Sequence, residues 1–136
     1  MNTEELKREI SVAAAEIRRL HARIHETVRY RDASKLKRNE WSDACAKFHA
    51  RYDMLAFPDG YDGAVERIVA GDPKAMEAAI CFLELRPYFF RSGYMFSQIL
   101  RKVKRAPLSP QQADRLRLVI ERQTEWRSKR LASRTT

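Results

Sequence analysis

The chain has 136 residues, of which 44% are apolar and 33% charged, and its formal net charge is +9. With only 4 glycines and 5 prolines, this composition predicts a single helix-rich domain over residues 1–136 and disfavours a many-stranded β fold. No apolar run approaches the ~20 residues of a membrane helix, and the N-terminal MNTEELKREI lacks the apolar stretch of a signal peptide, so we expect neither.

Residues 3–57 predict two long helices that form an antiparallel, coiled-coil-like hairpin. The first helix runs to about Tyr30 with Thr3 as its N-cap, and Asp32 or Ser34 starts the second. Apolar residues recur at alternating four- and three-residue spacing in both helices: Leu6, Ile10, Ala13, Ile17, Leu20 and Ile24, then Trp41, Cys45, Phe48, Tyr52 and Leu55. Two such seams joined by a short link cover each other. Self-association of the first helix with a second copy of the chain satisfies the same pattern.

FPDGYDG (residues 57–63) ends the hairpin because its proline and glycines do not continue a helix without cost. Beyond it, residues 62–130 predict about four shorter helices that form two helical hairpins, and residues 131–136 a frayed tail. The predicted boundaries are Ala64–Ala70 before Gly71, 73–86 after an Asp72 N-cap, Tyr94–Arg105, and 110–130 after a capping box of Ser109 and Gln112.

Three segments of this half support a comparison with a known class: Val65, Ile68 and Val69 before GDP, then AMEAAICFL, then QILRKV before APLSPQQADRLRLVI. On these segments, residues 62–127 resemble the HEAT-like class of α-helical hairpin repeats. The resemblance implies a stacking scaffold that binds other macromolecules, and it implies no catalytic residue.

Few residue patterns favour catalysis or metal binding. His21 and His25 lie one helical turn apart, but two histidines are too few ligands for a zinc site. Cys45 and Cys81 fall in helical patterns far apart, which is typical of buried thiols in a reducing, cytoplasmic protein. No phosphate-binding glycine loop or nucleophile elbow occurs in the sequence. We therefore expect no enzyme, no cofactor, no metal and no small-molecule ligand.

The positive charge is concentrated at the C-terminal end, where residues 91–136 carry 12 basic and 3 acidic residues. The candidate binding residues in this part are Arg101, Lys102, Lys104, Arg105, Arg115, Arg122, Lys129 and Arg130. Arg115, Arg122 and Lys129 recur every seven residues, which predicts one stripe on the last helix. A secondary basic cluster surrounds the hairpin tip: Arg29, Arg31, Lys35, Lys37 and Arg38. Each cluster can be a solvated face or a contact surface.

RPYFFRSGYMF (residues 86–96) concentrates five aromatic residues. We expect Phe89, Phe90 and Phe96 to fill a wedge between the helices. Tyr88, Arg91 and Tyr94 are amphipathic, so at least one of them should reach the surface as an aromatic contact point.

Together these patterns predict a non-enzymatic, all-α module that binds an acidic protein surface through its basic C-terminal helices, as an adaptor or inhibitor. The alternative is a nucleic-acid-binding accessory subunit that contacts phosphates through the same face. A membrane partner is not expected.

Overall fold

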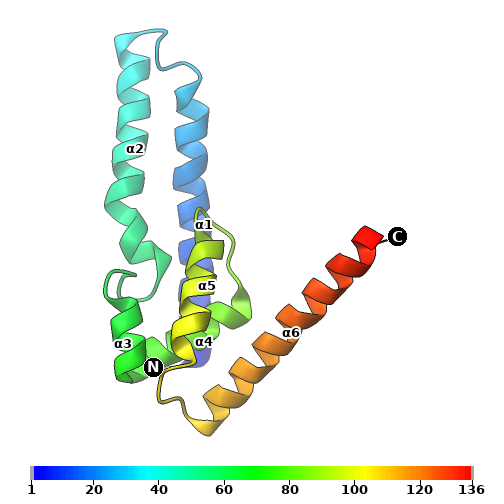
Figure 1. The fold of residues 1–136 in the computed structure, drawn as a ribbon. Coiled ribbons are helices and arrows are strands. Elements are labelled where there is room, and N and C mark those ends of the chain that lie inside the picture. Colours follow the sequence, from blue (N-terminus) through cyan, green and yellow to red (C-terminus); the bar gives the residue numbers. More distant parts are fainter. Residues whose placement is uncertain (1, 136) are drawn as a thin grey trace.

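The computed structural model describes residues 2–135 of the chain, and the side chains of residues 2–134. Over this range the chain forms six helices and no strand, which confirms the predicted all-α class (Figure 1). The helices are α1 (Thr3–Val28), α2 (Lys35–Ala56), α3 (Ala64–Ala70), α4 (Pro73–Leu85), α5 (Ser92–Val103) and α6 (Pro110–Thr135). None of these described helices combines the length and apolarity that a bilayer crossing requires.

Helices α1 and α2 form the predicted antiparallel hairpin and pack along each other over most of their length (Figure 1). The N-cap of α1 is Asn2 rather than the predicted Thr3, because the Asn2 side-chain oxygen accepts hydrogen bonds from the backbone amides of Glu4 (2.7 Å) and Glu5 (3.3 Å). Ser34 caps α2, and its hydroxyl oxygen accepts from the Lys37 amide at 3.1 Å. Both helices therefore begin with a side chain that satisfies free amides.

The seam of α1 is buried inside the chain, and its pattern is wider than the heptad-like prediction. Leu6, Ile10, Ile17 and Leu20 are buried as expected, but Ala14 is buried in place of Ala13, which is half-buried. The reason is that α1 packs against α4 as well as α2, so it buries a broad helical face instead of a narrow seam. The apolar face of α1 is therefore covered by α2 and α4 of the same chain.

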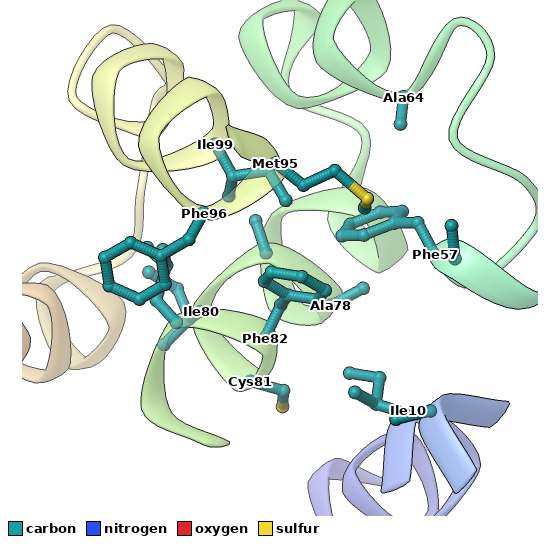
Figure 2. Close-up of a cluster of buried hydrophobic side chains, with 14 of the residues drawn as sticks. Ile10, Phe57, Ala64, Ala78, Ile80, Cys81, Phe82, Met95, Phe96 and Ile99 are labelled. Atoms are coloured by element: carbon teal, nitrogen blue, oxygen red, sulfur yellow. The ribbon is translucent and has the colours of Figure 1, made fainter. Parts of the chain in front are cut away.

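Helix α4 lies at the centre of the C-terminal part and contacts α1, α3, α5 and α6. Its middle is buried on every side: Ala75, Met76, Ala78, Ala79, Ile80, Cys81, Phe82 and Leu83. Figure 2 shows the Phe82 ring between Phe57 and Ile10, with Met95 and Ile99 of α5 above it. Each large side chain buried here contributes roughly 1.5–3 kcal/mol, so this cluster holds the two halves of the chain together.

The predicted turns around α4 and α6 are confirmed. Gly71 ends α3 with φ +89°, and the Asp72 carboxylate accepts from the Ala75 amide at 2.9 Å at the start of α4. At the start of α6, the Gln112 amide donates to Ser109 Oγ (3.1 Å) and the Ser109 amide donates to Gln112 Oε1 (3.0 Å). These reciprocal bonds form a capping box.

Helix α6 differs from the prediction in length and packing. It continues through Thr135, so residues 131–135 are helical where the sequence indicated a frayed tail, and residue 136 lies outside the described residues. With 26 residues it is as long as α1. Its main packing partner is α4, whereas the two-hairpin prediction pairs it with α5. Leu116 and Val119 are buried, and the C-terminal half projects away from the body (Figure 1).

The packing of α1 predicts a strong difference between two aspartate substitutions. Ile17 is 1% exposed and Val12 is 64% exposed on the same helix. We expect Ile17→Asp to lower the free energy of unfolding by about 3 kcal/mol or more, because it buries an unpaired carboxylate. The matched Val12→Asp variant should lose less than about 1 kcal/mol. Urea unfolding followed by circular dichroism measures both, and equal losses would show that the face is wrongly assigned.

Candidate binding surfaces

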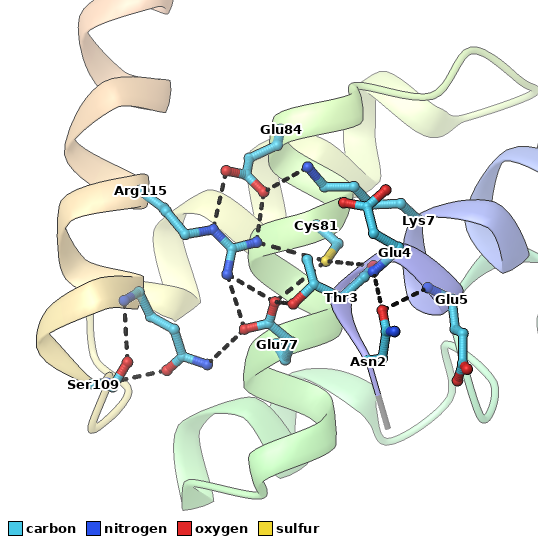
Figure 3. Close-up of polar contacts among 11 residues, drawn as sticks. Asn2, Thr3, Glu4, Glu5, Lys7, Glu77, Cys81, Glu84, Ser109 and Arg115 are labelled. Atoms are coloured by element: carbon cyan, nitrogen blue, oxygen red, sulfur yellow. Dashed lines mark hydrogen bonds and ion pairs between the residues drawn. The ribbon is translucent and has the colours of Figure 1, made fainter.

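Arg115, a predicted contact residue of the basic stripe, is instead held by two carboxylates of α4. Its Nε and Nη2 donate to Glu84 at 3.1 and 2.6 Å, and its Nη1 donates to the two oxygens of Glu77 at 2.7 and 3.0 Å (Figure 3). The Arg115 side chain is only 24% exposed. This bridge fixes α6 against α4 and engages Nε, Nη1 and Nη2 of Arg115 within the chain.

Residues from α1 and α6 complete the bridge. The Thr3 hydroxyl donates to Glu77 at 2.9 Å, Gln112 Nε2 donates to the same carboxylate at 3.1 Å, and Lys7 Nζ lies 3.5 Å from Glu84. Glu77 and Glu84 are separated by two turns of α4. Only the approach of α6 brings a guanidinium between them, so no local pattern could have revealed this bridge.

The bridge shifts the pKa of each ionisable partner. Burial alone would raise the pKa of Glu77, but hydrogen bonds from Gln112, Arg115 and Thr3 outweigh it and leave that pKa lowered. The pKa of Glu84 is lowered in the same way, with burial opposed chiefly by Arg115. Hydrogen bonds from Arg115 to Glu84 raise the pKa of Arg115. Burial, with the charge of Glu77 beside it, raises the pKa of the Cys81 thiol to about 11, so this thiol is neutral at neutral pH.

The other predicted cations of the C-terminal part face different directions. Lys102 is half-buried beside Asp53, Asp62 and Glu66, in a hollow with acidic walls. The rest are exposed and, among the described residues, have no carboxylate within 4.0 Å: Arg101, Lys104, Arg105, Arg122, Lys129 and Arg130. The basic face therefore remains on α5 and α6, but without Arg115 or Lys102 at its centre.

An apolar groove lies between the connection from α5 to α6 and the first half of α6. We name it the connection groove; its volume is about 530 Å³, and its walls are Ala106, Pro107, Leu108, Ala113, Leu116 and Ile120. Lys104, Arg117 and Glu121 form its rim. Arg117 is paired with Glu121 at 3.4 Å, whereas Lys104 is unpaired among the described residues. The sequence indicated only a connection here, because the groove requires α6 to pack on α4.

The secondary cluster at the hairpin tip is partly neutralised. Asp32 pairs with Arg38 and lies 3.9 Å from Arg31, whose guanidinium stacks over Trp41 at 5.0 Å. Lys37 is paired with Glu40 at 3.4 Å. Arg29 and Lys35 have no ion pair among the described residues. The tip therefore offers two free cations rather than five.

The aromatic corner is pinned to the hairpin. Phe89 and Phe96 are each 5% exposed, as predicted, but Phe90 is 43% exposed, so its assignment to the core was wrong. The Phe90 ring lies instead over His21, with ring centres 5.0 Å apart. Backbone oxygens hold the segment in place, because Tyr52 Oη donates to Phe90 O and Arg18 donates to Tyr88 O, both at 2.7 Å.

The predicted aromatic contact group is divided in two. Tyr88 is 80% exposed and lines one hollow together with Arg91. Tyr94 is 64% exposed, but its hydroxyl accepts from Gln98, which itself accepts from Tyr61. Tyr94 is therefore linked to Tyr61 in the connection between α2 and α3, and the contact group reduces to Tyr88 and Arg91.

The two histidines of α1 differ in exposure: His25 faces solvent, whereas His21 is half-buried against Phe48 and Phe90. Burial, followed by the charge of His25, lowers the pKa of His21. Among residues 2–135 no three side chains of the histidine, cysteine and carboxylate types are grouped as metal ligands.

No protein-family description matches this chain, and no curated protein or solved structure does either.

The bridge predicts that Arg115 is worth more to stability than any neighbouring arginine. We expect Arg115→Met to lower the free energy of unfolding by about 2 kcal/mol, because it leaves Glu77 and Glu84 partly buried without their cation. The exposed Arg122 provides the matched control, and Arg122→Met should change it by less than about 0.5 kcal/mol. Chemical denaturation measures both, and equal effects would contradict a structural role for the bridge.

The lowered pKa values predict a loss of stability in acid. The pKa values of both carboxylates are lower in the folded state than the ordinary value of 4.5. Such a carboxylate stabilises the folded state fully above pH 4.5, and this stabilisation is lost as pH falls through the folded-state pKa. The wild type should therefore lose its advantage over a Glu77→Gln/Glu84→Gln variant below about pH 4.5. Thermal melts from pH 3 to 7 compare the two, and a constant difference would contradict the shifts.

Proposed function

We propose that this chain is a non-enzymatic α-helical binding module, of the adaptor or inhibitor type, which docks on an acidic protein partner. The docking surface is the connection groove with the exposed cations beside it, Lys104 and Arg105. This assignment keeps the basic C-terminal helices as the binding region and moves its centre away from Arg115.

The combination of an apolar groove with two cations beside it that are unpaired among the described residues, Lys104 and Arg105, supports this proposal. The half-buried Leu108 and Ile120, together with the buried Leu116, form the apolar wall of the groove. Lys104 and Arg105 at the end of α5 have no carboxylate partner among the described residues. A partner segment that places an apolar side chain in the groove and acidic residues along the rim gains burial in its centre and charge complementarity at its edge.

The charge layout adds a kinetic argument. The net charge of residues 91–136 equals the +9 of the whole chain, so an acidic surface is attracted to this end of the molecule before contact. In this proposal residues 62–127, which resemble HEAT-like helical hairpins, form a rigid scaffold for the groove. The free thiols of Cys45 and Cys81 are consistent with a reducing, cytoplasmic setting.

A second function, binding of nucleic acid as an accessory subunit, is favoured by one observation. Six of the predicted C-terminal cations are exposed without a carboxylate neighbour in the described part of the chain, and free cations of this kind contact phosphates.

Charge reversal tests the proposed docking surface. We expect the wild-type chain to retain a protein partner from native lysate that a Lys104→Glu/Arg105→Glu variant retains at least about tenfold less, because two contacts with acidic groups become repulsive. Quantitative mass spectrometry of material bound to each bait measures the ratio, and circular dichroism checks that the helices persist.

The matched control is Arg29→Glu/Lys35→Glu, which reverses the two free cations of the hairpin tip. This variant changes the net charge by the same amount but lies outside the proposed docking surface. It should therefore retain the partner at the wild-type level. Equal binding to all three baits would contradict the proposal. Loss of the bound protein after nuclease treatment would show that nucleic acid holds it, and would favour the second function.

A further inference from the structure

Three neighbouring hollows, none of which shares a lining residue with the connection groove, together form one surface. The first lies between α4 and α6 and includes Arg86, Phe96, Arg122 and Trp126. The second, around the aromatic corner, shares Arg86 and Phe96 with the first and adds Tyr88 and Arg91. The third shares Tyr88 and Arg91 with the second and reaches Arg18 and His21 on α1. Shared walls make the three hollows continuous.

We name this surface the arginine–aromatic strip; its defining residues are Arg18, Arg86, Tyr88, Arg91, Arg122 and Trp126. It runs from α6 across the aromatic corner to α1, and it brings together residues more than a hundred positions apart in the sequence.

Arginine and aromatic side chains are stacked along the strip. The Arg86 guanidinium lies 4.7 Å from the ring centre of Phe96 and 5.5 Å from that of Trp126, and Arg91 lies 5.4 Å from that of Phe90. A guanidinium held flat against a ring keeps its N–H edge available for phosphate oxygens. Tyr88 is 80% exposed, and Trp126 is 49% exposed although the guanidiniums of Arg86 and Arg130 lie 5.5 and 5.3 Å from its ring centre.

The strip is also free of opposing charge. Among the described residues that line its hollows, Glu84 is the one carboxylate, and Arg115 and Lys7 already bind it. Arg86 and Arg91 adopt the left-handed backbone region, with φ of 46° and 68°, where glycine would be less strained. The strip therefore presents arginine at two positions whose backbone disfavours it, which is typical of functional surfaces.

We propose that the strip binds single-stranded nucleic acid, with phosphates on its arginines and bases stacked on Tyr88 and Trp126. Single strands expose base faces that a duplex keeps paired and stacked, and a channel of cations interleaved with aromatic rings accepts them without reading their sequence. An acidic peptide would match the charge, but it has few flat groups for the two exposed rings. This activity goes beyond the proposed docking of a protein, because the strip shares no lining residue with the connection groove.

The test measures binding of labelled oligonucleotides of about twelve residues, dT and rU, by fluorescence anisotropy at two salt concentrations. We expect Tyr88→Ala/Trp126→Ala to weaken binding about thirtyfold or more, since each stacked base is worth about 1 kcal/mol or more. We expect Arg91→Glu/Arg122→Glu to weaken it as well, and to flatten the dependence of log K on log salt by about 1.4. Tighter binding of dT or of rU identifies the natural strand, and either supports the strip.

Matched controls lie at the hairpin tip, far from the strip. Tyr30 is 59% exposed, so Tyr30→Ala removes an exposed ring, and Arg29→Glu/Lys35→Glu reverses two free cations. Both should leave affinity within about threefold. Four outcomes would overturn the proposal: no binding at low salt, equal affinity for the matching duplex, equal losses in strip and tip variants, or equal competition by polyglutamate. The Lys104→Glu/Arg105→Glu variant tests protein docking separately. In this variant bases should still stack on Tyr88 and Trp126.

Discussion

The burial of α4 along its middle positions four of the other helices, and α2 takes its place by packing on α1. A helix apolar around its whole circumference must be covered by neighbours, and here α1, α3, α5 and α6 provide the cover. The two carboxylates on α4, Glu77 and Glu84, are the exception to its apolar character, and both point to one seam that Arg115 closes. Apolar burial thus brings α6 to α4, and the guanidinium bridge fixes where along α4 it sits.

Much of the fold could be predicted from local patterns. Apolar spacing predicted the long hairpin, and Asp72, Gly71 and the Ser109–Gln112 box predicted helix ends correctly, because caps depend only on residues a turn apart. The predicted buried face of α1 included Ala13 instead of Ala14, because the sequence does not show that α4 is a second neighbour of α1. The position of α6 was harder still, since nothing within residues 110–130 shows which helix it meets.

The candidate surfaces could be predicted only in part. The concentration of cations in residues 91–136 was visible in the sequence, but the role of each depends on what lies opposite. Arg115 meets two carboxylates and becomes structural, whereas Arg122, two turns along the same helix, meets none. Phe90 and Tyr88 are exposed because the side chains of Tyr52 and Arg18 donate hydrogen bonds to their backbone oxygens and hold the segment at the surface. Such long-range partners leave no trace in a local pattern.

The projecting half of α6 makes the arrangement sensitive to small changes at its base. About twenty residues separate Arg115 from the end of the helix, a length of ~30 Å. A tilt of ~10° at the bridge would therefore move the far end by ~5 Å. The geometry of the Arg115 guanidinium between its two carboxylates therefore sets the angle between the projecting half of α6 and the rest of the molecule.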